Sequence, residues 1–563
     1  MVGVGLLYRQ GNFHQQLDRS GWQHEFWVES DPGRLPAALV TGGDSAPLTV
    51  EVSLSGRPVV VQVWRVNVGR VPLYLLDADR PENSRSDRWI TARLYIGDRQ
   101  ARIAQYALLG LAGVRALRAM GIEPAVMHLN EGHAALAPLE VAREAVAEGT
   151  PVEEAIEAAR RRTVFTTHTP VPAGNEAFSP EEVLRLLGDF PKELGLEPGE
   201  LLDLGRVHSN DEPFGLTVLG LHLARRAGGV SRRHGQVARA MWRNLYPDRD
   251  EADVPITHVT NGVHLPTWMA PPMRGLLSRH LGDGWEERAG EAAAWNGVDA
   301  IPDRDLWAVR SALRSELVDF VRDRTVADRL GRGEPSAYAE GALDGFDPEA
   351  LTIGFARRVV AYKRLPLLIQ DPERLLQLLD GSRPVQIVVA GKAHPQDEDA
   401  KGILQSVFRL DLGRQAAAER MVFLEDYDLA LAAKLVSGCD LWVNLPRPPL
   451  EASGTSGMKA ALNGGINLSV LDGWWEEAYD GSNGWAIRSD PDADPATQDV
   501  RDAGSLYDLL QEKVVAQFFD RDGQGIPRAW INKVKASLRS IGPRFCATRM
   551  LQDYVGTIYE LKR

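Results

Sequence analysis

Short apolar runs alternate with helix-like amphipathic stretches along most of the chain. In the second part of the chain successive runs are about 20–35 residues apart, which matches the length of βαβ units. This alternation predicts an α/β fold with parallel strands. The predicted strands are residues 123–129, 162–167 and 254–260 in the first part of the chain, and residues 350–355, 385–390, 421–426, 441–445 and 466–471 in the second part.

A polar stretch that contains glycine and proline, residues 331–349, separates these two groups of strands. Such a composition is typical of a connecting segment, so we place the boundary between two lobes there. Residues 511–563 have a mostly helical pattern, and residues 1–8 read as a buried strand.

Unusual polar residues come directly after predicted strands in both parts of the chain. His133, His168 and Asn261 do so in the first part, and Arg358, Lys363 and the loop 451–459 do so in the second. Ligands of open α/β sheets bind at the carboxyl ends of the strands. Two lobes that face each other would bring these residues to one cleft.

Composition and charge exclude several classes of function. The chain has 563 residues, of which 44% are apolar and 25% charged, and this composition is that of a globular protein with several structural units. No apolar run approaches the roughly 20 residues that cross a bilayer. The net charge of −13 argues against nucleic acids and anionic membranes as partners. With only two cysteines, a disulfide framework is excluded, and we expect a cytoplasmic protein.

The segment Glu451-Ala-Ser-Gly-Thr-Ser-Gly-Met-Lys459 carries the most chemical information. Small residues let backbone N–H groups crowd around an anion, and the start of a helix adds a favourable dipole. A lysine at this place can bind an aldehyde cofactor that carries a phosphate. The alternative is an ordinary helix start with a solvated lysine.

Four cations lie close together after the strand at 350–355. They are Arg357, Arg358, Lys363 and Arg364. Because like charges so close repel one another, an anion among them is the economical interpretation, and phosphate fits it. The alternative is a solvated basic helix face.

Two weaker patterns involve histidine. His128, Glu131 and His133 suggest a metal site at first sight, but the two histidines at i and i+5 would not share a helix face. We therefore expect hydrogen-bonding roles and no metal. His168 precedes Thr-Pro-Val-Pro, whose prolines stiffen the loop, and by itself it could equally be structural.

Taken together, these segments resemble the α-glucan phosphorylases, which act on glycogen, starch and maltodextrin, and most closely their short bacterial and archaeal branch. The resemblance covers nearly the whole chain. It rests on Leu129-Asn-Glu-Gly-His133, Thr167-His-Thr-Pro170, Val259-Thr-Asn-Gly-Val263, Arg358-Val-Val-Ala-Tyr-Lys-Arg364, Leu424-Glu-Asp-Tyr427 and Glu451-Ala-Ser-Gly-Thr-Ser-Gly-Met-Lys459.

The resemblance implies two Rossmann-like lobes around a deep cleft, the GT-B glycosyltransferase architecture. Residues 1–345 would form the first lobe and residues 346–520 the second, with residues 521–563 as helices that return to the first lobe. It also implies that the family's glycine-rich loop and first strand–helix unit precede Met1, so we expect the first lobe to be incomplete.

The resemblance further implies pyridoxal 5′-phosphate (PLP) bound covalently at Lys459. The other cofactor-binding positions would be Thr455, Ser456, Arg357 and Tyr427. Arg358 and Lys363 match residues that hold the substrate phosphate, and His168 matches a histidine that contacts the sugar. The substrate-binding positions would be Asn261, Glu451, Ser453, Gly454, Tyr362, His133 and Asp98. Asp428 departs from the family, because animal and plant members carry arginine there.

The sequence therefore predicts an α-1,4-glucan phosphorylase, which transfers a glucosyl unit from glycogen or maltodextrin to orthophosphate with retention and releases glucose 1-phosphate. A homo-oligomer is possible, since dimers are usual in the family. Two alternatives stay open. One is a nucleotide-sugar glucosyltransferase of the same fold, such as a glycogen synthase, and the other is a truncated glucan- or PLP-binding remnant without catalysis.

Overall fold

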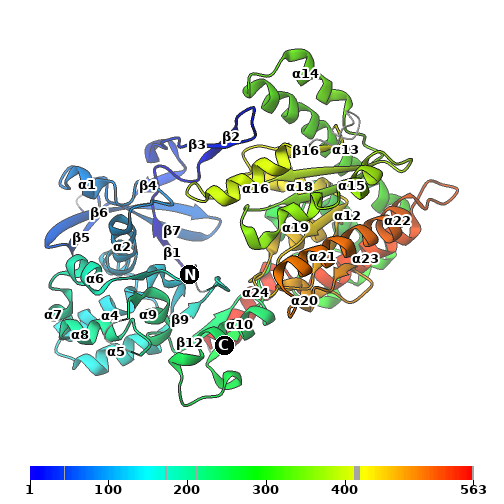
Figure 1. Cartoon of the computed structure of the whole chain (residues 1–563). Coiled ribbons are helices and arrows are strands. Elements are labelled where there is room, and N and C mark those ends of the chain that lie inside the picture. The colour runs from blue at the N-terminus through cyan, green and yellow to red at the C-terminus, as the bar shows by residue number, and fades with distance from the viewer. Residues whose placement is uncertain (44, 172–173, 209–211, 411–418, 561–563) are drawn as a thin grey trace.

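The computed structural model describes residues 1–43, 45–171, 174–208, 212–410 and 419–560. It has a mixed α/β architecture with parallel sheets, which are distributed over two lobes (Figure 1). The predicted fold class is therefore confirmed. Among the described residues, no helix is both long and apolar enough to cross a membrane.

The second lobe is built on a six-stranded parallel sheet. Every residue of its four inner strands is buried, as is typical of parallel strands that are covered on both faces. The predicted strands of this part all occur, and β19 is an addition. In sheet order the strands are β16 (Met421–Leu424), β15 (Val385–Ala390), β14 (Leu351–Ala356), β17 (Leu441–Asn444), β18 (Ile466–Val470) and β19 (Gly484–Ile487).

The first lobe contains two larger sheets. One is mixed, because β1 (Gly3–Leu6) pairs in parallel with β7 (Val71–Asp77), whereas the other pairs are antiparallel. Only Leu6 of β1 is buried, so the strand at the start of the chain is less buried than predicted. The remaining strands of this sheet are β4 (Ala37–Leu39), β5 (Thr49–Leu54) and β6 (Arg57–Val68).

The other sheet of the first lobe is parallel and four-stranded. Three of its strands coincide with predicted ones, while β12 is glycine-rich and was not predicted. Its strands in sheet order are β13 (Ile256–His258), β12 (Arg226–Gly229), β9 (Thr163–Thr166) and β8 (Met127–Asn130). The polar residues that follow β8, β9 and β13 therefore lie toward one edge of this sheet.

The hydrophobic core of the second lobe includes residues that precede the predicted lobe boundary. Buried apolar residues from Val263 to Leu313 belong to the same cluster as the six-stranded sheet. The boundary between residues 345 and 346 remains a prediction. The long helix α13 (Asp303–Gly331) contributes to this core and contacts α18 (Leu429–Gly438).

α13 has two buried arginines, of which Arg310 anchors the helix that carries Lys459. Arg310 Nη1 donates to Ser437 O at 2.6 Å and to Asn463 O at 2.7 Å. Asn463 is the C-cap of α19 (Thr455–Leu462). Arg314 Nη1 donates to Asp440 Oδ1 at 2.9 Å. Arg310 satisfies carbonyl groups at the ends of α18 and α19 and so fixes α19 within the lobe, whereas Arg314 binds the carboxylate of the residue before β17.

Two segments connect the lobes at their periphery. The hairpin of β2 (His14–Leu17) and β3 (Gln23–Phe26) reaches the second lobe (Figure 1), where Gln15 Nε2 donates to Gly391 O and Gln23 Nε2 to Ala393 O, both at 2.9 Å. At the other end of the chain, α24 (Ala547–Asp553) leads into the π-helical turn η12 (Tyr554–Tyr559). Tyr559 there bonds His128 of the first lobe at 2.7 Å.

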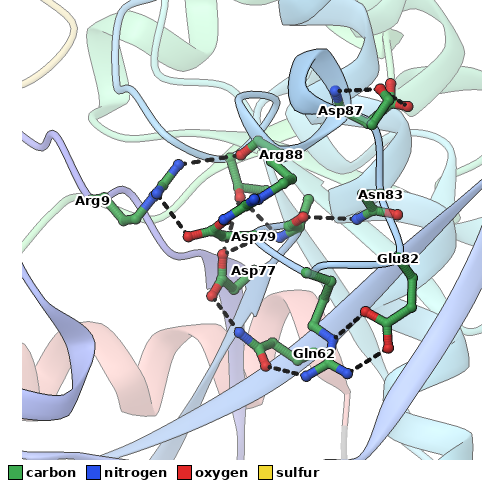
Figure 2. A network of polar contacts seen from close by, with 12 residues as sticks. Arg9, Gln62, Asp77, Asp79, Glu82, Asn83, Asp87 and Arg88 are labelled. Atoms are coloured by element: carbon green, nitrogen blue, oxygen red, sulfur yellow. Dashed lines mark hydrogen bonds and ion pairs between the residues drawn. The ribbon is translucent and has the colours of Figure 1, made fainter.

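A polar network, which we call the Asp77 network, fixes the segment between β7 and α2 (Arg99–Ala107) (Figure 2). Asp77 Oδ2 accepts from Gln62 Nε2 at 2.8 Å and from Trp64 Nε1 at 3.1 Å. Asn83 Nδ2 donates to the backbone carbonyls of Val60 and Ala78, each at 2.7 Å. The network therefore joins two strands to the loop that follows them.

Candidate active site

The predicted basic residues lie in a turn at the carboxyl end of β14. Arg357 and Arg358 follow the strand directly, and Lys363 ends the 3₁₀ turn Ala361–Lys363. The Lys363 ammonium donates to Glu451 Oε1 at 2.6 Å, and Arg357 Nη2 donates to Glu451 Oε2 at 2.7 Å. These three side chains, each less than a tenth exposed, form what we call the Glu451 cluster.

The Glu451 cluster has more positive charge and more donors than its one carboxylate can satisfy. Arg357 Nε and Nη1 are buried and have no hydrogen-bond partner among the residues described. Burial, and then the charge of Arg357, lower the pKa of Lys363 to about 7. Burial acts to raise the pKa of Glu451, but Arg357 and Lys363 outweigh it and lower this pKa. An additional anion would satisfy the unpaired donors.

The helix that carries Lys459 begins beside this cluster. Gly454 precedes α19 in a left-handed conformation with φ +85°, and no side chain in the described structure caps the helix. A Cβ atom on Gly457 would lie 2.3 Å from Asn467 Oδ1, so a small residue is required there. The helix start therefore presents backbone N–H groups that can bind an anion.

Lys459 lies in the second turn of α19. Its Nζ is 3.6 Å from the centre of the Trp268 ring, and burial lowers its pKa to about 8. Ser456 Oγ accepts from Trp442 Nε1 at 3.1 Å, so its hydroxyl has a structural partner and its backbone N–H is the group left for a ligand. A lysine with a lowered pKa offers more neutral amine for covalent attachment to an aldehyde.

The structure brings two predicted tyrosines to the Glu451 cluster. The ring of Tyr362 lies 4.7 Å from Lys363 Nζ, and burial followed by the charge of Glu451 raises the pKa of Tyr362. Burial raises the pKa of Tyr427 to about 12, and the charge of Arg357 acts on this group. Both phenols are therefore neutral hydrogen-bonding groups at physiological pH.

On the first lobe, the ends of β8 and β9 are joined through Glu131. This residue has φ +62°, an uncommon conformation for a residue with a side chain. Its Oε1 accepts from Thr167 Oγ1 at 3.3 Å and from the backbone N–H of His168. His168 Nε2 lies 3.2 Å from Asn130 Oδ1, and loss of solvation is the main cause that lowers its pKa.

His133, the other predicted histidine, is exposed and stacks on Tyr106, with ring centres 5.0 Å apart. The charge of His133 acts on His168, so the two rings are neighbours. His128 bonds Thr166 and Tyr559 instead. Within the described part of the chain, no three His, Cys, Asp or Glu side chains are arranged to hold a metal ion.

Two predicted substrate positions have mainly backbone or local contacts. Asn261 N donates to Val230 O at 3.0 Å, and Asn261 O accepts from Arg549 Nη2 at 3.2 Å. Asp98 is exposed and caps α2 by accepting from Ala101 N at 2.8 Å. The structure thus gives the Asp98 carboxylate a helix-capping role.

Three further buried polar groups belong to this part of the structure, of which Ser453 was predicted from the sequence and Asn444 and His234 were not. Ser453 Oγ and Asn444 Nδ2 are buried without a partner in the described residues. His234 lies at the start of α10 (Arg232–Met241), and its Nδ1 accepts from Val230 N at 3.2 Å. Burial lowers the pKa of His234 to about 4.

The neutral ring of His234 therefore carries its proton on Nε2, and the backbone of Thr169 acts on this ring and opposes the effect of burial on its pKa. The Nε2–H group is thus a fixed hydrogen-bond donor. A Ser–x–x–His pattern that follows a strand was the available signal in the sequence. It was not recognised because β12 itself is glycine-rich and gives only a weak strand pattern.

Comparison with known proteins identifies the family of the chain. A sequence profile described as carbohydrate phosphorylase matches residues 207–478. The chain is 46% identical to the glycogen phosphorylase of Mycobacterium tuberculosis, over 99% of this chain and 66% of the relative. It is 41% identical to the maltodextrin phosphorylase of Thermococcus litoralis, again over 99% and 66%.

The glycogen phosphorylase of Aquifex aeolicus is 37% identical, over 99% of this chain and 80% of the relative. The chain spans 66% of the length of the first two relatives. The resemblance that the motifs indicated is confirmed, and the chain belongs to the carbohydrate phosphorylase family.

Proposed function

We propose that this protein is an α-1,4-glucan phosphorylase, which transfers a terminal glucosyl unit from glycogen or maltodextrin to orthophosphate and releases glucose 1-phosphate with retained configuration. The names of the relatives, glycogen phosphorylase and maltodextrin phosphorylase, support this activity. The observation that carries the proposal is the pair of unpartnered, buried nitrogens on Arg357, which lies in the same site as the uncapped start of the Lys459 helix.

The residues present fit PLP as the cofactor. Lys459, with a pKa of about 8, has an appreciable neutral fraction near neutral pH. The backbone N–H groups of Thr455 and Ser456 at the helix start, together with Arg357, would hold the cofactor phosphate. When bound, PLP would supply a phosphate group that can exchange a proton with the substrate phosphate. Tyr427 would complete the cofactor-binding residues.

The substrate phosphate would bind Arg358 and Lys363. Two phosphates close together repel each other, so the site needs fixed positive charge between them. Lys363 has a pKa of about 7 in the protein alone, and a bound anion would raise this pKa and keep the ammonium charged. Glu451 holds both Lys363 and Arg357, so it fixes the direction in which their remaining donors point.

The glucosyl unit would bind between the lobes. We assign its hydroxyl groups to Asn261, Ser453, Gly454, Tyr362, His133 and His168, with Asp98 on a loop of the first lobe. Glu451 would bind sugar as well as cations. His234 joins this set because its ring lies close enough to His168 for the charges of the two rings to interact. Fixed donors of this kind can favour a transition state over the ground state.

The test uses the full chain loaded with PLP, with maltoheptaose and orthophosphate as substrates. We expect glucose 1-phosphate to form in the wild type, and none in Lys459→Ala. The matched control is Lys533→Ala, which removes a lysine that bonds Ser482 O elsewhere in the second lobe and should keep the activity. A wild type that binds PLP and glucan but forms no glucose 1-phosphate contradicts the proposal. Glucosyl transfer from ADP-glucose that is independent of orthophosphate also contradicts it.

A further inference from the structure

A buried hydroxyl of the first lobe contacts the loop 451–454 of the second lobe. Ser231 Oγ donates to Ala452 O at 2.6 Å, and Ser231 has no exposed surface. The same oxygen accepts from His234 N at 3.1 Å, because Ser231 is the N-cap of α10. One hydroxyl group is thus both a helix cap and a contact between the lobes.

A second connection runs through Glu477 in the short helix α20 (Trp474–Ala478). Glu477 Oε1 accepts from Thr260 Oγ1 at 2.9 Å and from Arg232 N at 3.2 Å. Thr260 follows β13 and Arg232 follows β12, so one carboxylate oxygen joins the ends of two first-lobe strands to a helix of the second lobe.

The start of α20 is itself bonded to the loop 451–454. Trp474 N donates to Ser453 O at 2.9 Å, and Glu451 N donates to Asp472 Oδ2 at 2.8 Å. Gly473 turns the chain between them with φ +55°, and a Cβ atom there would lie 2.6 Å from Ser453 O. The loop and the start of α20 therefore form one unit, which the first lobe contacts twice.

We propose that Ser231 and Thr260 are positioning residues, which act through Ala452 and Glu477 to hold the loop 451–454 in its ligand-binding conformation. Docking of the two lobes then adds to the order that contacts within the second lobe give to the loop. That the ligand is a sugar rests on the proposed function, whereas the coupling between docking of the lobes and order of the loop does not.

Two substitutions break the two connections separately. Ser231→Ala removes the bond to Ala452 O, and Thr260→Val removes the bond to Glu477 with almost no change in side-chain shape. The matched control is Ser179→Ala. Ser179 caps α6 (Pro180–Leu187) by accepting from Glu182 N at 3.2 Å, so its loss costs a helix cap without touching the loop.

The experiment compares these variants as full chains loaded with PLP, by hydrogen exchange with mass spectrometry of a peptide that covers residues 451–456. We expect exchange to be about tenfold faster in Ser231→Ala, severalfold faster in Thr260→Val and unchanged in Ser179→Ala. Exchange within twofold of the wild type in both Ser231→Ala and Thr260→Val overturns the proposal, even if α10 itself becomes less protected.

Calorimetry with maltopentaose gives the second readout. We expect the Kd to rise about five- to tenfold in Ser231→Ala and to stay unchanged in Ser179→Ala, with the same absorption of the bound cofactor in all variants. Unchanged sugar affinity in Ser231→Ala, when the wild type binds the sugar, overturns the role in ligand binding. A wild type that binds no sugar overturns the proposed function, and hydrogen exchange still decides the coupling.

Discussion

The Asp77 network and the Glu451 cluster are both groups of buried polar side chains, but they differ in how completely they are satisfied. In the Asp77 network the Asp77 carboxylate accepts from Gln62, from Trp64 and from the backbone N–H of Asp79, and of the residues labelled in Figure 2 only Arg9 has a buried nitrogen, Nε, without a partner in the described structure. In the Glu451 cluster one carboxylate faces two cations, and two nitrogens of Arg357 lack partners in the described structure.

This difference distinguishes buried polar groups that stabilise the fold from buried polar groups that bind a ligand. A buried network whose groups are satisfied stabilises one conformation, whereas unsatisfied buried donors cost free energy unless a ligand binds them. A folded protein keeps such donors where they serve binding or catalysis. The comparison predicts that substitutions in the Asp77 network change mainly stability, and that substitutions in the Glu451 cluster change mainly binding.

The largest effect is expected for Lys363→Met. Loss of its charge should lower kcat/KM for orthophosphate by about 100-fold or more, because a charged donor to the substrate phosphate is removed. Steady-state kinetics at saturating maltoheptaose checks this, with Lys533→Met as the matched control. Unchanged orthophosphate kinetics in a destabilised Lys363→Met variant would contradict the claim that the Glu451 cluster serves binding.

Asp77→Asn should lower the stability of the protein and leave its orthophosphate kinetics nearly unchanged. The amide cannot accept at every position where Asp77 now accepts, so we expect the free energy of unfolding to fall by about 2 kcal/mol. Urea unfolding followed by tryptophan fluorescence measures this change. KM for orthophosphate should stay within about twofold of the wild type, and a tenfold increase would show that the network belongs to the site.

The rate at which PLP attaches to Lys459 should depend on pH. The neutral form of this lysine is the nucleophile, so the rate of PLP attachment should rise about tenfold per pH unit below pH 8 and level off above the pKa of about 8. Rapid-mixing absorbance on the cofactor-free protein from pH 6 to pH 10 records this profile. A rate that continues to rise to pH 10 would mean that Lys459 titrates as an ordinary exposed lysine.

The smallest effect is expected for Ser456→Ala. It leaves the buried Trp442 Nε1 without its acceptor, which should cost about 1 kcal/mol of unfolding free energy. PLP affinity should remain within about twofold, because the backbone N–H is retained. A PLP affinity that falls tenfold in a fluorescence titration would instead assign the cofactor contact to the Ser456 hydroxyl.

Sequence reasoning succeeded where a local pattern determines the structure. The strand Val385–Ala390 was predicted with its observed bounds, because a continuous run of apolar residues is sufficient to indicate a buried parallel strand. The hairpin at residues 14–26 was missed because its buried Gln15 and Gln23 are satisfied by backbone carbonyls at residues 391 and 393. No local pattern reveals partners so distant in the chain.

In the candidate site, too, contacts between distant parts of the chain could not be predicted from local patterns. The basic turn at 357–364 was recognised from its charges, but the position of Glu451 between Arg357 and Lys363 depends on how β14 and the loop after β17 pack together. Ser231 and His234 were missed because the glycine-rich strand before them gives only a weak strand pattern, so their Ser–x–x–His spacing was not recognised. Their roles depend on contact between the two lobes.

The most direct test of the central claim is to locate the cofactor on the chain. The full protein is saturated with PLP, reduced with borohydride and digested, and the modified peptide is identified by mass spectrometry. We predict a pyridoxyl group on Lys459, and a reduced yield at this residue in Arg357→Met. An unmodified Lys459 in a folded, PLP-saturated preparation, or a label spread over surface lysines, would contradict the account.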